Sequence, residues 1–280
     1  MKNSNRIVFI DYVRVIACFL VMLVHASENF YCISADTTML ANESNRFWVG
    51  FYDGALGRMS VPLFMVVSAF LLVPVKPNVS MSDFYKHRFK RIIPPLVFFM
   101  LIYCFLPLAW GQMTWEQSWQ DFRLLPFTFP SMAGHLWFMY PLISLYLIIP
   151  VVSPWLERAS AKEERLFLIF FMLSTLVPWL TRFVSSNLWG TCFWNPYFGM
   201  FYYCSGYLGY LVMAHYIRVH LKWDRAKRLK VGIGSFVAGA AFTAWSAWHA
   251  GIPGIVMHPA MNGHGNSVLR TFCLLLLEPS

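Results

Sequence analysis

Long apolar stretches that contain no charged residue alternate with short basic segments along this 280-residue chain. Asp, Glu, Lys and Arg are all absent from residues 92–115, 131–156, 166–181, 183–217 and 231–269. A helix needs about 17 to 25 mostly apolar residues to cross a bilayer, so most of these stretches fit one span each. The pattern predicts seven spans and the start of an eighth, at residues 6–28, 59–75, 92–110, 136–156, 166–181, 191–214, 231–248 and from 267 onward.

The spans are predicted to be helices, because runs of this length lack the alternation of apolar and polar residues that is typical of a barrel strand. No internal repeat or low-complexity tract divides the sequence. The expected fold is therefore all-α, a polytopic transmembrane helix bundle of about seven to eight spans. Residues 1–280 are expected to form a single integral-membrane domain.

The positive charges indicate which way the bundle faces. With a cytoplasmic N-terminus, 16 Lys and Arg residues lie in inner segments, whereas only Arg46, Arg123 and Arg182 lie in outer ones. Cytoplasmic loops are enriched in these two residue types. We therefore expect a multi-pass protein of the cytoplasmic (inner) membrane with its N-terminus inside the cell. The net charge of +9 then follows mostly from topology.

The composition agrees with a membrane location and excludes other classes. Hydrophobic residues make up 58% of the chain and charged residues 12%, about half the roughly 25% usual in soluble domains. The lipid bilayer is the expected partner, and no nucleic acid is expected, because topology already explains the basic residues. Asp11 and Arg14 argue against a cleaved signal peptide, since they would fall within its apolar region.

No metal is expected from the sequence. The six cysteines are scattered, mostly within predicted spans, and suit apolar packing. His249, His258 and His264 share an outer loop, but their steps of 9 and 6 residues match no familiar ligand spacing.

The first predicted span carries ionisable residues that a bilayer normally excludes, namely Asp11, Arg14, His25 and Glu28. Arg14 and His25 are 11 residues apart, which in an α-helix is about 20° beyond three full turns and roughly 16 Å along the axis. One helix face is therefore expected to join a cation near the inner surface to an imidazole near the outer one. Two alternatives stay open: Arg14 can snorkel to lipid headgroups, and His25 can simply bond a carbonyl group or a headgroup at the helix end.

Polar residues of other predicted spans lie at the same two depths. Arg58, His135 and Trp137 are expected at the outer level of His25, and Arg88 and Arg91 at the inner level of Arg14. Packing alone is an equal explanation for Arg58 and His135. Topology and headgroup binding are the alternative for the two inner arginines.

Five segments carry polar or small residues among apolar ones. The first, "DYVRVIACFLVMLVHAS", has an Arg, ten residues and a His within one predicted helix, and the second is "GRMSVPLFMVVSAFLL". The others are "KHRFKRIIPPL", "HLWFMYPLISLYLIIPVVSP" and "YYCSGYLGYLV". Taken together and in this order, the five segments resemble the membrane-bound acyltransferase 3 family, with Ala69 where the family usually has Gly. Members usually have about ten helices, so the resemblance also implies that the last helices of the family are missing from this sequence.

The resemblance implies transfer of an acyl group, generally acetyl, from cytoplasmic acetyl-CoA (acyl-CoA) to a hydroxyl group of a lipid-linked or cell-surface glycan. In that chemistry Arg14, Arg88 and Arg91 suit the phosphates of the donor. His25 suits the general base, with an acyl-histidine as a variant, and Glu28 is positioned to orient its ring. Arg58, His135 and Trp137 suit the acceptor or the oxyanion. The alternatives are a transporter or flippase of a lipid-linked sugar, or a catalytically silent membrane partner.

Overall fold

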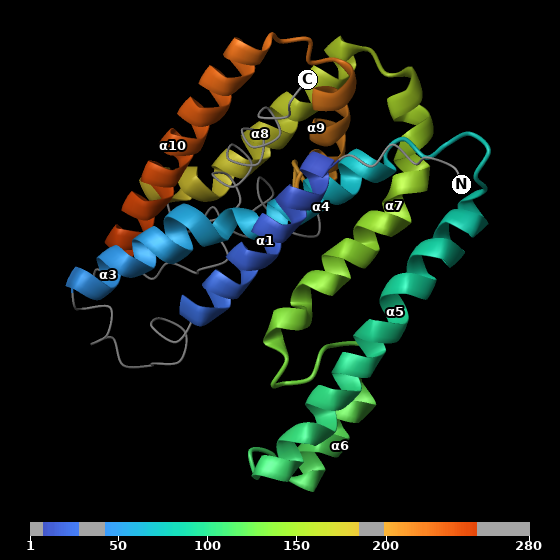
Figure 1. Ribbon diagram of the computed structural model, residues 1–280, viewed down its shortest axis with the longest axis vertical. Coiled ribbons are helices and arrows are strands. Elements are labelled where there is room, and N and C mark those ends of the chain that lie inside the picture. Colours follow the sequence, from blue (N-terminus) through green and yellow to red (C-terminus); the bar gives the residue numbers. More distant parts are fainter. Residues whose placement is uncertain (1–7, 28–42, 185–198, 251–280) are drawn as a thin grey trace. The chain divides into compact units, whose positions relative to one another are not determined.

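The computed structural model describes residues 8–27, 43–184 and 199–250 of the chain (Figure 1). Every regular element in these ranges is a helix, so the all-α prediction is confirmed for the described part of the protein. The elements are α1 (Val8–Ser27), α3 (Glu43–Val49), η2 (Gly50–Leu56), η3 (Gly57–Met59), α4 (Ser60–Leu72), α5 (Met81–Phe105), η4 (Leu106–Trp110), α6 (Trp115–Leu124), η5 (Gly134–Phe138), α7 (Met139–Arg158), α8 (Ala161–Val184), α9 (Leu208–Val219) and α10 (Arg225–Ala250).

Three described segments are long and apolar enough to cross a membrane: Val8–Ala26, Met81–Trp110 and Gly134–Arg158. They coincide with the first, third and fourth predicted spans. The third begins at Met81 rather than residue 92, because Ser80 caps α5 by accepting a hydrogen bond from the Asp83 amide at 3.0 Å. The basic segment before residue 92 is therefore helical.

The remaining predicted spans match shorter or displaced helices. The second corresponds to α4, which has 13 residues, and the fifth and seventh lie within α8 and α10. Only the C-terminal part of the predicted 191–214 span is helical in the described residues, because α9 begins at Leu208 after a series of turns. The start of that span and the predicted eighth span lie outside the described residues.

The chain divides into two compact units. The second unit, Pro74–Trp155, contains α5, α6 and most of α7. In this unit α5 and α7 are antiparallel neighbours: the Tyr85 hydroxyl donates to the Leu147 carbonyl at 2.8 Å, and the Tyr103 ring lies edge-on to His135 at 5.0 Å. Helix α6 packs against α5 and begins with a capping box formed by Thr114 and Gln117.

The first unit, Met1–Val73 and Leu156–Ser280, holds the other helices. Helix α4 packs against both α1 and α9, and α9 also packs against α8. Leu63, Met65, Phe171, Tyr210 and Leu211 are among its fully buried side chains. This core is built where α9 packs against α4 on one side and against α8 on another.

Polar contacts fix the relative directions of these three helices. Near its C-terminus, α9 carries Arg218, which donates to the Phe70 carbonyl at 2.6 Å and to the Val73 carbonyl at the C-terminus of α4. Glu164, in the first turn of α8, bonds to His215 near the C-terminus of α9. The C-termini of α4 and α9 and the N-terminus of α8 therefore lie at the same end of this unit.

Candidate functional site

Helix α1 positions the two residues that the sequence singled out first. Its buried side chains are Ile10, Val13, Ala17 and Leu20, which follow the helical repeat and face the core of the first unit. At 100° per residue, Arg14 and His25 lie together on a flank roughly 90° away from the centre of this buried face. Because α1 is unbroken from Val8 to Ser27, Arg14 and His25 lie on one face of a single continuous helix.

Arg14 and His25 have different surroundings. Arg14 is exposed and forms an ion pair with Asp11, one turn earlier, with 3.6 Å between Nη1 and Oδ1. His25 is half-buried in the last turn of α1. Glu28, its predicted orienting partner, lies outside the described residues.

Arg58 belongs to η3, a segment that packs against α1. The contact is tight, because a Cβ atom on Gly57 would overlap the Val24 side chain. Val24 precedes His25 and Gly57 precedes Arg58, so the backbone of Arg58 lies close to the His25 end of α1. The outer membrane level of Arg58 stays a prediction.

The other predicted site residues belong to the second unit. Arg88 and Arg91 lie on neighbouring turns of α5, with the Arg88 guanidinium 5.6 Å from the centre of the Phe84 ring. His135 and Trp137 lie in η5 and are exposed. Since His135 contacts Tyr103, 15 residues after Arg88 on α5, the two groups are separated by roughly 22 Å along that helix. Within this unit, Arg88 and Arg91 therefore lie at a different level of α5 from the contact of Tyr103 with His135.

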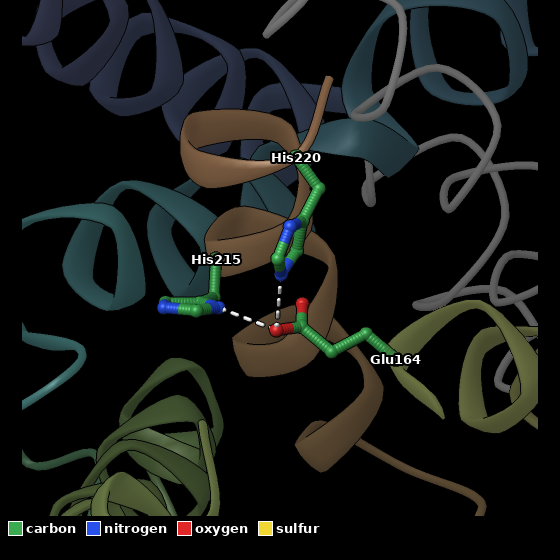
Figure 2. Close-up of side chains that lie close together, drawn as sticks. All are labelled: Glu164, His215 and His220. Atoms are coloured by element: carbon green, nitrogen blue, oxygen red, sulfur yellow. Dashed lines mark hydrogen bonds and ion pairs between the residues drawn. The ribbon is translucent and has the colours of Figure 1, made fainter. Parts of the chain in front are cut away.

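The structure also reveals a cluster that the sequence analysis missed, formed by Glu164, His215 and His220 (Figure 2). His215 Nδ1 lies 2.8 Å and His220 Nε2 lies 3.1 Å from the same atom, Oε1 of Glu164. Glu164 has no exposed surface, and the two histidines are 5% and 19% exposed. We call these three side chains the Glu-His-His cluster.

The local fold explains how the cluster forms. His215 and His220 are five residues apart and are not on one helix face, but His220 is the residue that caps the C-terminus of α9. There the chain leaves the helix, so both imidazoles reach the same carboxylate oxygen (Figure 2). Next to the cluster, Arg165 donates from Nε and Nη2 to the Tyr216 hydroxyl at 3.3 and 3.2 Å, which adds a second link between α8 and α9.

A comparison with protein families identifies the chain. The model of the acyltransferase domain of the acyltransferase 3 family matches residues 7–277, which includes nearly all of the sequence. The chain belongs to the acyltransferase 3 family. It is therefore a membrane acyltransferase, and the resemblance seen in five sequence segments is confirmed. No curated protein and no solved structure matches this acyltransferase.

Proposed function

We propose that this acyltransferase moves an acetyl or other acyl group from cytoplasmic acyl-CoA to a hydroxyl group of a cell-surface or lipid-linked glycan. The observation that carries the proposal is the shared flank of Arg14 and His25 on α1, in a chain that belongs to the acyltransferase 3 family. A CoA thioester has several phosphate charges at one end and its reactive carbonyl at the end of a long arm. A cation and a base separated by roughly 16 Å on one helix suit such a molecule.

In this proposal, Arg14 binds donor phosphate through its guanidinium, which offers paired donors to phosphate oxygens. Asp11 occupies part of that guanidinium through the 3.6 Å ion pair. Phosphate binding therefore competes with Asp11 or shares Arg14 with it. Arg88 and Arg91 supply further phosphate contacts, from a basic turn of α5 that also includes Lys86 and Lys90.

His25 acts as the general base. Its neutral imidazole takes the proton of the acceptor hydroxyl while the oxygen attacks the thioester carbonyl. The tetrahedral intermediate then expels the CoA sulfur, which takes up the proton from the imidazolium. The products are an ester and CoA with a free thiol, so atoms and charges balance. Arg58, His135 and Trp137 are proposed to bind the acceptor, with Trp137 offering an aromatic face to a sugar ring.

The test uses membranes that contain the full chain and acetyl-CoA labelled in its acetyl group. Transfer of the label to a glycan, identified by mass spectrometry, is the expected result. His25→Ala should abolish transfer, whereas His87→Ala, which removes an exposed imidazole of α5, should leave it intact. Full transfer by the His25 variant would overturn the assignment of the base. Movement of unlabelled glycan across the membrane without acylation would instead support a carrier.

A further inference from the structure

We propose that the Glu-His-His cluster is a binding site for one divalent transition-metal ion, and that zinc fits it best. This inference is independent of the proposed acyl transfer, because none of the three residues has a part in that reaction. It also departs from the sequence-based expectation of no metal. Three arguments support it: an unsatisfied buried oxygen, the chemistry of the ligands, and their spacing.

The first argument is the state of the Glu164 carboxylate. Both histidines bond to Oε1, whereas Oε2 is buried and has no hydrogen-bond partner among the described residues. Burial of a carboxylate without compensation is costly, and an unpaired lone pair in an interior adds to that cost. A cation held by the carboxylate would compensate the charge and, when bound through both oxygens, would also satisfy Oε2.

The second argument is the choice of donor atoms. Two imidazole nitrogens and one carboxylate are the protein ligands of many zinc sites, in which a fourth position is left for water or another group. Calcium and magnesium prefer oxygen ligands throughout, so this set does not suit them. The cluster is therefore expected to bind a transition-metal ion such as zinc in preference to calcium or magnesium.

The third argument is distance. Zinc-ligand bonds of about 2.0 to 2.1 Å in a tetrahedron put neighbouring ligand atoms roughly 3.3 Å apart. In the cluster, Oε1 lies 2.8 Å from His215 Nδ1 and 3.1 Å from His220 Nε2, and all three ligand atoms lie within 4.8 Å of one another. Small rotations of the three side chains would open enough space for an ion. His220, which is 19% exposed, marks the side from which an ion can enter.

Such an ion would join the N-terminus of α8 to the C-terminus of α9, across 51 residues of sequence between Glu164 and His215. Because metal binding to a folded site is coupled to folding, the ion would stabilise the packing of these two helices. The competing explanation is a cluster held by hydrogen bonds alone, with a proton in place of the metal. The experiment below separates the two.

The full chain, purified in detergent without a polyhistidine tag, is stripped with a chelator and titrated with Zn²⁺. The expected result is one tightly bound zinc per chain, measured by elemental mass spectrometry after removal of free metal, together with a higher unfolding temperature. Co²⁺ in place of Zn²⁺ should give the visible absorption of a tetrahedral site. A folded wild-type protein that binds no zinc, or whose unfolding temperature does not respond, would overturn the proposal.

Variants then assign the site. Glu164→Gln, His215→Gln and His220→Gln should each weaken zinc binding by more than roughly 100-fold, beyond the loss caused by removal of an outer-shell partner. His87→Gln, which removes a histidine from α5, is the matched control and should bind zinc as the wild type does. If a cluster variant fails to fold, the wild-type titration still decides whether zinc binds. Unchanged stoichiometry in all three variants would place any bound zinc elsewhere and refute the assignment.

Discussion

The ring of Phe171 on α8 lies directly against the backbone of Gly209 on α9, so closely that a Cβ atom at this position would overlap the ring. The same ring meets Tyr210 edge-on, with 5.5 Å between ring centres and 74° between planes. Gly209 therefore sets how closely α8 and α9 approach. This approach also brings Glu164 of α8 within hydrogen-bond distance of His215 of α9.

Gly209→Ala should destabilise the protein, because the buried Phe171 ring has to move. Overpacking of this kind typically costs about 1–3 kcal/mol. Gly234→Ala is the matched control, since a Cβ atom there meets nothing within 4 Å and alanine is favoured over glycine in a helix by about 0.5–1 kcal/mol. Thermal unfolding in detergent should give a lower midpoint for the first variant and an equal or higher one for the second. Equal midpoints for both variants would contradict the close packing.

Arg218 should stabilise the fold as well as contribute positive charge. Its guanidinium bonds to the carbonyl oxygens of Phe70 and Val73 and lies 5.6 Å from the centre of the Phe70 ring. Hydrogen bonds that involve a charged group contribute about 1.5–3 kcal/mol each. Because the Arg218 side chain is exposed and water can replace part of its two bonds, Arg218→Met should lower the free energy of unfolding by the value of one such bond, about 1.5–3 kcal/mol. Arg225→Met removes the same charge from the exposed start of α10 and should have little effect; comparable losses in both variants would mean that charge alone matters.

Arg88 and Arg91 allow topology and donor binding to be separated. Lysine keeps the positive charge that orients a membrane protein, but it lacks the planar fork that binds phosphate through two hydrogen bonds. The double variant Arg88→Lys, Arg91→Lys should therefore keep the wild-type topology and raise the KM for acyl-CoA. Accessibility labelling reports the topology, and initial rates report the KM. The complementary variant Lys86→Arg, Lys90→Arg should leave the KM unchanged; an unchanged KM in both would exclude the two arginines from donor binding.

Acid should weaken the N-terminus of α8 through Glu163. The hydroxyl and the backbone amide of Ser160 both donate to Glu163 Oε2 at 2.7 Å, and these bonds lower the pKa of the Glu163 carboxyl below its ordinary value of 4.5. The folded state therefore prefers the ionised form. Its stabilising effect is complete above the pKa of the unfolded chain and is lost as the pH falls through the lower folded value. Unfolding midpoints measured from neutral to acidic pH should fall less steeply for Glu163→Gln than for wild type; parallel curves would refute this role.

The sequence predicts the helices well where one uncharged run forms one helix. Residues 136–156 are an example, because this run lies almost entirely within α7, Met139–Arg158. Prediction is poorer for residues 199–214, the described part of the predicted 191–214 span. Apolar composition cannot distinguish the turns before Leu208 from helix, and it does not show where α9 begins.

Within the candidate functional site, the features that can be predicted from the sequence are those that depend on a single helix. The spacing of Arg14 and His25 is enough to place them on one flank once α1 is known to be continuous. The Glu-His-His cluster is different, because Glu164 is distant in sequence from the two histidines and meets them only once α8 packs against α9. Arg218 is a similar case, because the carbonyl groups that it binds, those of Phe70 and Val73, lie far away in the sequence at the C-terminal end of α4.

The ion pair between Asp11 and Arg14 gives a direct test of phosphate binding by Arg14. Its side chains are 34% and 46% exposed, and exposed pairs contribute about 0.2–1 kcal/mol, a factor of up to roughly five in an equilibrium constant. If donor phosphate competes with Asp11, Asp11→Asn should lower the KM for acyl-CoA by up to about fivefold and leave kcat unchanged, whereas Arg14→Gln should raise the KM. In the double variant, Asp11→Asn should have no further effect, because the guanidinium through which it acts is gone. A decrease in KM that persists without Arg14 would show that Asp11 repels the donor on its own and that Arg14 does not hold the phosphate.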